Sequence, residues 1–415
     1  MNSQRLHLLN NVILITIDSL SASDMSIYGY HRNTTPFISD FSKTCYVFNS
    51  MYANSNSTYP GIYSILTGKY PTKNNLNNLI SFFINLFKGK NIIDLLKREG
   101  YQILIIAALD KVFISAKNKV LSINPTTNLY ISLSSKKNIT YTELFLNNIF
   151  KKAFELLEKA KSPFFFWLHI YPPHAPYLPS ERFRGRFLLE NSFNDAISQK
   201  PYINKFYSKE MQPEIYKLRC RYNEQILDVD FSIGKLFNLL KQEGFMQNTI
   251  IIITSDHGEI FEKGFMGHGG RYLYNPLIRI PLLIHLPGNR ERKMIRNNAQ
   301  QVDILPTILD ILGFDIPKWI DGKSLKHSMD NTSQINEPVF SIGRFFHKVR
   351  WQSEVNPIAV VHDGYKLIYQ PGQIYDELYN ITDDPAETQN LSRDEVERTK
   401  LLKHLIKTAI LKYNN

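Results

Sequence analysis

Two long apolar runs, each ending in an aspartate, constrain the fold of this chain more than any other feature. One is Asn11-Val-Ile-Leu-Ile-Thr-Ile-Asp18, and the other is Asn248-Thr-Ile-Ile-Ile-Ile-Thr-Ser-Asp256. Runs of this kind, without polar alternation, are typical of strands that are buried on both faces of a parallel sheet. Residues 101–107 and 163–169 form two further apolar runs that fit the same scheme.

Helical patterns lie between these strands. Apolar residues recur at a spacing near 3.6 over residues 143–161 and 222–243, and residues 92–99 end at a glycine that fits a helix C-cap. Because strands alternate with helices, the sequence predicts an α/β fold with a mostly parallel central sheet flanked by helices.

The last part of the chain has a different pattern. Residues 338–369 resemble a set of short strands, and residues 394–412 resemble a closing helix. We therefore predict that residues 1–335 form the main α/β domain and that residues 336–415 form a small α+β subdomain packed on it. Residues 74–90, rich in asparagine around an apolar patch, are interpreted as an insertion.

The chain is basic, with 49 Lys and Arg residues against 38 Asp and Glu residues and a formal net charge of +11. Such a balance is compatible with positive charge spread over a solvated surface, or with attraction to an anionic substrate, a membrane face or nucleic acid. We find neither a long basic run nor a nucleic-acid-binding motif, so we expect no nucleic-acid partner.

Cysteine content and the N-terminal residues bear on the compartment. Cys45 and Cys220 are the only two cysteines, which argues against a disulfide framework and favours two buried thiols. Residues 1–10 lack the pattern of an export signal, and the apolar runs at 12–17 and 79–87 are too short to span a membrane. The expectation is a cytoplasmic protein without a transmembrane segment.

Acids and histidines stand at the ends of the predicted strands. Asp18, His169 and Asp256 would all lie at the carboxyl edge of the sheet, where α/β proteins bind ligands. Asp18 with the Asp256-His257 pair offers the mixture of oxygen and nitrogen ligands that suits zinc or manganese, and suits calcium or magnesium less well. The alternative is that these acids cap helices or turns.

A threonine at the start of a predicted short helix is a candidate nucleophile. Pro60 fits the first turn of that helix and Gly68 fits its end, so Thr58 would lie at a helix N-terminus that favours an anion. Metal coordination can lower the pKa of a threonine hydroxyl and orient it for attack. The alternative is that Thr58 only caps the helix.

Taken together, these segments resemble the sulfatase-like branch of the alkaline phosphatase and sulfatase superfamily. The matching segments occur in family order from one end of the chain to the other, over residues 11–18, 28–30, 34–36, 58–71, 172–177, 228–244, 254–259, 267–269, 274–288, 303–307, 321–322 and 377–380. The resemblance implies an alkaline phosphatase-like fold and a metal-dependent hydrolase or transferase that acts on sulfate or phosphate esters. Residues 1–335 would then be the catalytic domain.

The resemblance also implies roles for particular residues. Asp18, Asp256, His257 and Thr58 would hold one divalent metal ion, and Thr58 would be the nucleophile. The remaining site residues would contact the substrate: His174 near the leaving group as a candidate general acid, His268 near the bound oxyanion, and Arg271 where many members carry a basic residue. His169 is interpreted as a core or supporting histidine.

Three departures from the sulfatase pattern argue against the formylglycine mechanism, and the missing formylglycine motif favours phosphorus chemistry. Formylglycine-type sulfatases carry Cys or Ser, any residue, Pro, Ser and Arg, whereas this chain has Thr58-Tyr59-Pro60-Gly61-Ile62. Ser19 replaces a usual second aspartate, and Ala108-Leu109-Asp110 replaces a usual basic pair. A threonine nucleophile instead resembles phosphoethanolamine transferases, lipoteichoic acid synthases and nucleotide phosphodiesterases, which form a phosphothreonine.

Two functional hypotheses follow. The first is a metal-dependent enzyme for an anionic ester of a sugar, a lipid or a small molecule, with a phosphate ester favoured. The second is a catalytically silent sulfatase-like domain that binds anionic glycans or lipids, which the loss of the arginine at Ile62 and of the basic pair would allow. The presence of all four predicted metal-site residues favours the enzyme.

Overall fold

A central sheet organises the chain in the computed structural model, which describes residues 9–71, 90–109, 127–133, 142–188, 205–330, 336–343, 356–370, 372 and 376–414. In spatial order its strands are β11 (Lys293–Gln300), β2 (Tyr46–Tyr52), β10 (Leu282–His285), β7 (Thr249–Ser255), β1 (Asn11–Ile17), β5 (Phe164–Ile170), β3 (Gln102–Leu109) and β4 (Thr127–Leu133), with β9 (Arg279–Ile280) beside β2. Only β10 and β9 run antiparallel to their neighbours. The predicted mostly parallel α/β sheet is therefore confirmed.

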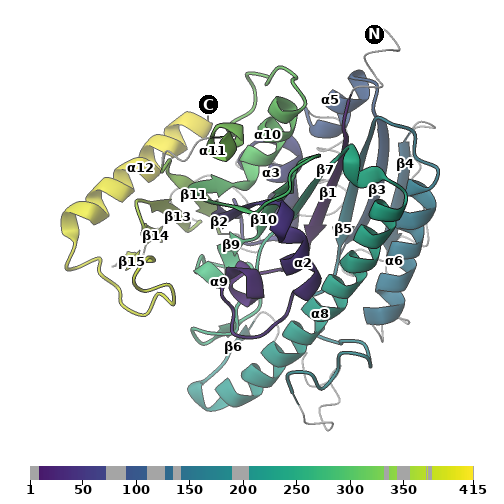
Figure 1. Cartoon of the computed structure of the whole chain (residues 1–415). Coiled ribbons are helices and arrows are strands. Elements are labelled where there is room, and N and C mark those ends of the chain that lie inside the picture. Colours follow the sequence, from purple (N-terminus) through teal and green to yellow (C-terminus); the bar gives the residue numbers. More distant parts are fainter. Residues whose placement is uncertain are drawn as a thin grey trace.

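Helices cover both faces of this sheet (Figure 1). One face carries α2 (Pro36–Phe41), α6 (Thr142–Leu157) and α8 (Gln212–Gln242), and the other carries α3 (Thr58–Thr67), α5 (Ile92–Arg98) and α10 (Ile304–Ile311). Along β1, Val12 and Leu14 pack toward α3 and α10, whereas Ile13 and Ile15 pack toward α6 and α8. A strand with apolar contacts on both sides needs the unbroken apolar run that the sequence shows.

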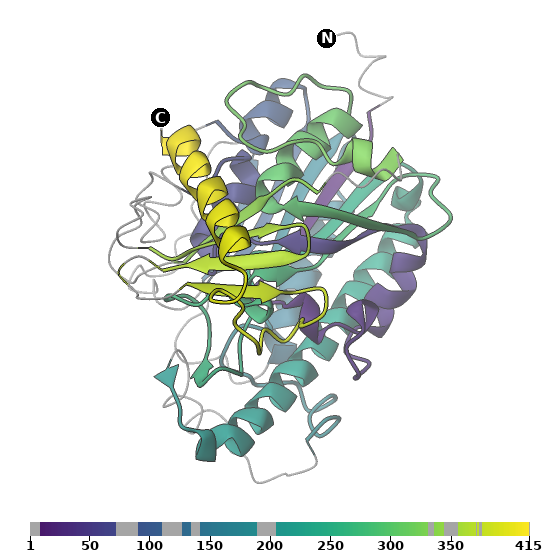
Figure 2. The ribbon, with the colours of Figure 1, turned by 90° about the vertical axis from the view of Figure 1, so that its left-hand side faces the viewer.

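A second, antiparallel sheet forms the C-terminal part of the fold. Its strands are β12 (Val339–Ile342), β13 (Ile358–His362), β14 (Tyr365–Tyr369) and β15 (Glu377–Asn380), and α12 (Val396–Asn414) lies across it (Figure 2). Leu402 and Ile406 of α12 pack on Val360 and Leu367 of the sheet. The predicted C-terminal α+β unit is thus present.

Contacts join this unit to the rest of the chain. The backbone N–H of Ile342 donates to the carbonyl of Asn54 at 2.9 Å, and the Asn54 side chain donates to the carbonyl of Phe340 at 2.8 Å. The division at residue 335 stays a prediction. Besides short 3-10 helices, the described residues also form α9 (Asn275–Ile278), α11 (Lys326–Asp330), β6 (Lys205–Phe206) and β8 (Phe265–Met266).

Some expected boundaries were wrong. Helix α8 begins ten residues before the predicted 222, since Pro213 fits its first turn and Ile215 and Leu218 continue the buried face. Helix α6 ends at Leu157 rather than 161, ahead of the Ser162-Pro163 pair that leads into β5. Residues 72–89, which include most of the interpreted insertion, lie outside the described residues.

Two other expectations can be compared with the structure. Cys45 and Cys220 are both buried and unbonded to each other, as predicted. Among the helices described, none is both long enough and apolar enough to cross a lipid bilayer.

Candidate metal centre and active site

Two aspartates meet at the carboxyl edge of the central sheet. Strands β1 and β7 are parallel neighbours with Ile17 opposite Ser255, so Asp18 and Asp256 follow them side by side. Both side chains are fully buried. Ser19 connects them, because its backbone N–H donates to Asp256 Oδ1 and its hydroxyl donates to Asp18 Oδ1, each at 3.0 Å.

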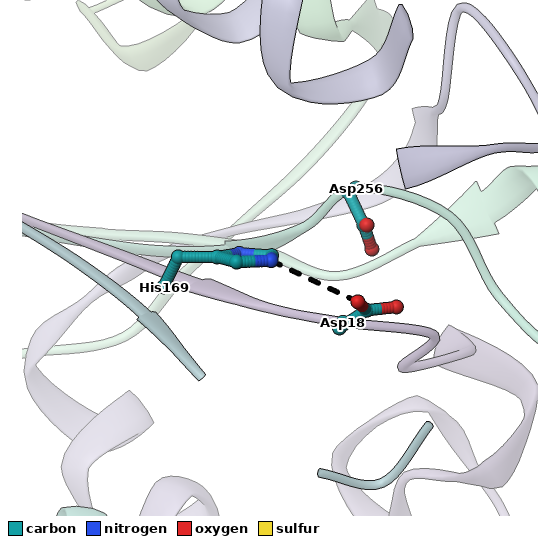
Figure 3. A group of neighbouring side chains, drawn as sticks. All are labelled: Asp18, His169 and Asp256. Carbon is teal, nitrogen blue, oxygen red and sulfur yellow. Dashed lines mark ion pairs between the residues drawn. The ribbon is translucent and has the colours of Figure 1, made fainter. Parts of the chain in front are cut away.

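Within the described part of the chain, each of these carboxylates keeps one oxygen without a hydrogen bond. Asp18 Oδ2 and Asp256 Oδ2 have no hydrogen-bond partner among the described residues, and neither has Nε2 of the buried His169. Ligand atoms of these three residues all lie within 4.8 Å of one another (Figure 3). Buried charge without a partner is costly, so this cluster fits a bound divalent cation.

His169 is the second-last residue of β5 and faces the carboxylates. It is fully buried, and its Nε2 lies 3.8 Å from Asp18 Oδ2 (Figure 3). Its Nδ1 lies 2.9 Å from the hydroxyl of Thr16, which also accepts a hydrogen bond from Trp167. The sequence analysis interpreted His169 as a core or supporting histidine, whereas the structure places its ring beside the Asp18 carboxylate. The available signal was its position near the carboxyl end of β5, the strand that pairs with β1.

His257 has a ring orientation suited to metal binding. Its Nδ1 lies 2.8 Å from the carbonyl of Gly258, which can only accept, so Nδ1 carries the proton and Nε2 presents a lone pair. That Nε2 lies 3.7 Å from Asp18 Oδ1 and 3.5 Å from Asp256 Oδ2. Two atoms bound to one zinc ion are separated by at most about 4.2 Å, so both spacings are compatible with a shared ion.

Thr58 is the first residue of α3, and its side chain reaches the same group. Its Oγ1 lies 3.2 Å from His257 Nε2, and Ser57 rather than Thr58 occupies the N-cap position. Gly61, one turn into the helix, lets α3 pack closely against the backbone of Asp256 at the end of β7. Any larger residue would place its Cβ on the carbonyl oxygen of Asp256. Close packing of α3 therefore places the threonine beside the carboxylates.

Two further predicted residues extend the site. His268 lies with its ring centroid 4.5 Å from that of His257 and 4.9 Å from that of His174. His174 is buried, and its Nδ1 lies 2.7 Å from the carbonyl of Ala175, so its Nε2 is the nitrogen available to a ligand. The three imidazoles form a row that begins at Thr58.

A buried glutamate supports this row and was not singled out from the sequence. Glu259 is fully buried, and its Oε1 lies 3.1 Å from His268 Nδ1. Burial by itself lowers the pKa of His268, but the negative charge of the Glu259 carboxylate outweighs burial and raises this pKa to about 9. The position of Glu259, two residues after His257 in the motif, was the available signal.

The two aspartates respond oppositely to their surroundings. Burial by itself raises the pKa of Asp18. The neighbouring imidazoles, above all that of His174, outweigh burial and hold this pKa well below its usual range. Burial and the charge of Asp18 raise the pKa of Asp256. Burial also lowers the pKa of His257, which favours the neutral ring that a metal ion requires.

The remaining predictions have different outcomes. Arg271 lies on the loop after His268, exposed, with its guanidinium 5.6 Å from the ring centre of Tyr272. Ile62 is fully buried in the apolar core beneath α3, so this position presents an apolar side chain where the sulfatase pattern has an arginine. Asp110 and the side chains of Ala108 and Leu109 lie outside the described residues.

Comparison with known proteins assigns the family. The Sulfatase family matches residues 10–314, which is well over half of the chain, and the family "N-sulphoglucosamine sulphohydrolase, C-terminal" matches residues 262–413. The chain therefore belongs to the Sulfatase family.

Several curated relatives carry sulfatase names. Arylsulfatase K of Bos taurus is 27% identical over 280 residues, which cover 60% of this chain and 51% of the relative. An N-acetylglucosamine-6-O-sulfatase of Bacteroides thetaiotaomicron is 25% identical over 472 aligned positions, covering 92% of this chain and 82% of the relative. The chain thus spans about half the length of the arylsulfatase K proteins that it matches.

Solved structures share the whole fold. A protein in complex with its substrate D-glucosamine-2-N,6-O-disulfate has a TM-score of 0.76 and 20% identity, covering 98% of both chains. The phosphonate monoester hydrolase of Agrobacterium radiobacter has a TM-score of 0.73 and 16% identity, covering 98% of this chain and 96% of its own. At these identities the likeness concerns the fold.

Proposed function

We propose that this chain is a metal-dependent enzyme that cleaves or transfers anionic esters, with Thr58 as its nucleophile. The metal ion would be held by Asp18, Asp256, His257 and Thr58. One observation carries the proposal: two buried carboxylate oxygens without hydrogen-bond partners among the described residues lie beside the Thr58–His257 contact. Buried acids that only cap turns would have their oxygens satisfied by backbone N–H groups.

The choice of ester depends on the nucleophile. Sulfatase names among the relatives support sulfate esters, and membership of the family makes a sulfuric or phosphoric ester the common class. Threonine cannot be converted to formylglycine, so we favour a phosphate ester or a related phosphoester. Two carboxylates with one or two imidazoles suit zinc or manganese better than calcium or magnesium.

When bound, a divalent ion lowers the pKa of a coordinated hydroxyl and offsets the charge of the ester oxygens. The chain positions the reacting atom, because α3 packing and the His257 contact hold Thr58 Oγ1 at the carboxylate edge. In the first step, Oγ1 would form a bond to phosphorus or sulfur while the bond to the leaving alcohol oxygen breaks. The Thr58 hydroxyl proton is lost to solvent.

The histidine row would complete the reaction. Nε2 of His174 would give a proton to the departing oxygen, since its Nδ1 is already bonded to the Ala175 carbonyl. The positively charged His268, held by Glu259, would stabilise the ester oxyanion. Water or an acceptor hydroxyl would then attack the Thr58 ester, and the threonine oxygen would be released.

Turnover of three model esters by metal-stripped and reconstituted protein tests this proposal. The substrates are p-nitrophenyl phosphate, bis-p-nitrophenyl phosphate and p-nitrophenyl sulfate, with zinc, manganese, magnesium and calcium added back singly. We expect phosphoester turnover with zinc or manganese. Sulfate turnover alone would overturn the phosphoester preference, and metal binding without any turnover would favour the catalytically silent alternative.

A further inference from the structure

A polar cleft lies between the central sheet and the C-terminal sheet. Strands β2, β9 and β11 contribute to one wall, and β13 with the turns that follow β13 and β15 contributes to the other. The volume of the cleft is about 640 Å³, which is within the range of small-molecule sites in proteins. Within the described part of the chain, no residue of the candidate active site lines this cleft.

Two arginines line the cleft, and both have donors to offer a ligand. Arg279 is half-buried, and its Nε and Nη2 donate to the carbonyl of Asn49 at 3.1 and 3.0 Å. These bonds fix the guanidinium and leave its Nη1 without a hydrogen bond among the described residues. Arg296 is exposed and forms neither a hydrogen bond nor an ion pair with any described residue.

The backbone brings the two arginines to the same wall. The register of β11 against β2 shifts between Ile295 and Asn298, whose partners are two residues apart on β2. Arg296 lies within this shift, beside Asn49 on β2. Such irregularities redirect side chains from the regular alternation of a strand. Because Arg279 is bonded to Asn49 as well, both guanidiniums belong to one part of the cleft.

The cleft has positive charge without a matching acid. Among the described residues that line it, there is neither an aspartate nor a glutamate. Two nearby acids contact lining residues, but lysines already neutralise them: Glu387 pairs with Lys366, and Glu337 pairs with Lys323 at 2.7 Å. A concave surface with one sign of charge concentrates ligands of the opposite charge.

We infer that this cleft binds the phosphate group of a small anionic molecule, at a site separate from Thr58. Nη1 of Arg279 and the planar guanidinium of Arg296 would donate to the phosphate oxygens. The side-chain amides of Asn49 and Asn336, which also line the cleft, supply further donors. A phosphate group has three acceptor oxygens and therefore uses more of these donors than a carboxylate does. The volume of the cleft leaves room for the rest of an organic phosphate.

Titration calorimetry on the manganese-loaded full chain tests this inference. Every variant also carries Thr58→Ala, so that the probes are not turned over. The probes are inorganic phosphate and glucose 6-phosphate. Arg296→Ala should weaken binding at the cleft at least about tenfold, because a charge-assisted contact is lost, and Arg296→Lys should weaken it less. Arg290→Ala, which removes another exposed arginine from the loop before β11, should leave the isotherm unchanged.

The variants separate the cleft from the metal centre. Phosphate bound at the metal centre would be present in all of them, so only the component that depends on Arg296 reports on the cleft. Thr382→Glu, which adds a carboxylate to the opposite wall, should reduce the same component. Tighter Arg296-dependent binding of glucose 6-phosphate than of phosphate would identify an organic phosphate as the occupant, and equal binding would identify the free anion. Isotherms that Arg296→Ala leaves unchanged with both probes would overturn the inference.

Discussion

Thr58 Oγ1 and His257 Nε2 lie 3.2 Å apart although 199 residues separate them in the sequence. The contact joins the N-terminus of α3 to the loop that follows β7, and those two segments pack against each other at Gly61. A hydroxyl, an imidazole lone pair and two buried carboxylates thereby share one small volume.

Replacing Asp256 with asparagine should abolish metal binding while preserving the fold. Asn at this position keeps an oxygen that can accept from the backbone N–H groups of Ser19 and His257. Wild-type protein should gain about 2.7 kcal/mol of unfolding free energy at a metal concentration one hundred times Kd, and Asp256→Asn should gain none. Metal content by mass spectrometry and thermal unfolding with and without metal check this; a variant that retains stoichiometric metal would exclude Asp256 as a ligand.

Substituting Gly61 with alanine should displace α3. The added Cβ would overlap the backbone carbonyl of Asp256, which has no flexible side chain to move away, so we expect a loss of about 1–3 kcal/mol in stability. Ester turnover should fall with it. Gly29→Ala is the matched control, because nothing lies within 4 Å of a Cβ there and only the cost of its positive φ remains. Equal effects of the two variants would contradict the account of α3 packing.

The ion pair between Glu259 and His268 should make stability depend on pH. The pKa of His268 is raised to about 9 in the folded chain from 6.5, so the pair stabilises the fold fully below about pH 6.5 and loses this contribution as the pH rises through 9. In metal-free protein, Glu259→Gln should therefore destabilise most near pH 6 and least above pH 9. NMR titration of His268 should show its pKa falling in the variant; an unchanged pKa would mean that Glu259 does not set the charge of this ring.

A buried ion pair in the C-terminal unit should contribute strongly to its stability. Lys366 and Glu387 form a fully buried ion pair, and the Lys366 ammonium also donates to the carbonyl of Leu273 at 2.9 Å. Lys366→Met should cost about 3–5 kcal/mol, because it leaves the Glu387 charge buried without its cation. Lys43→Met, which breaks the exposed pair with Asp40, should cost little. Chemical denaturation compares the two, and a small loss at Lys366 would indicate that water reaches Glu387.

Much of the fold could be predicted because each central strand carries its own signal. The buried strands β1, β7, β3 and β5 are unbroken apolar runs, and the glycine after α3 ends that helix as expected. Strand β2 was missed because Asn49 and Ser50 interrupt its pattern, and its place is decided by pairing with β10 and β11.

The candidate site was predictable in part for the same reason. Asp18 and Asp256 directly follow strands that pattern alone identifies, so their meeting follows from a parallel sheet. The direction of the His169 ring and the support of His268 by Glu259 depend on side-chain packing between distant segments. The positions of His169 and Glu259 in the sequence could indicate that they lie near the site, but not which way their side chains point.

The most direct test of the central claim is the reactivity of residue 58. Protein reconstituted with zinc or manganese is rapidly mixed with an ester that it turns over, and the reaction is quenched in acid. Peptide mass spectrometry should then detect the transferred group on Thr58. Thr58→Ala should show no modified peptide and at least about a thousandfold lower kcat, and Thr58→Ser should retain both. Full turnover by Thr58→Ala would contradict the nucleophile that this account assigns.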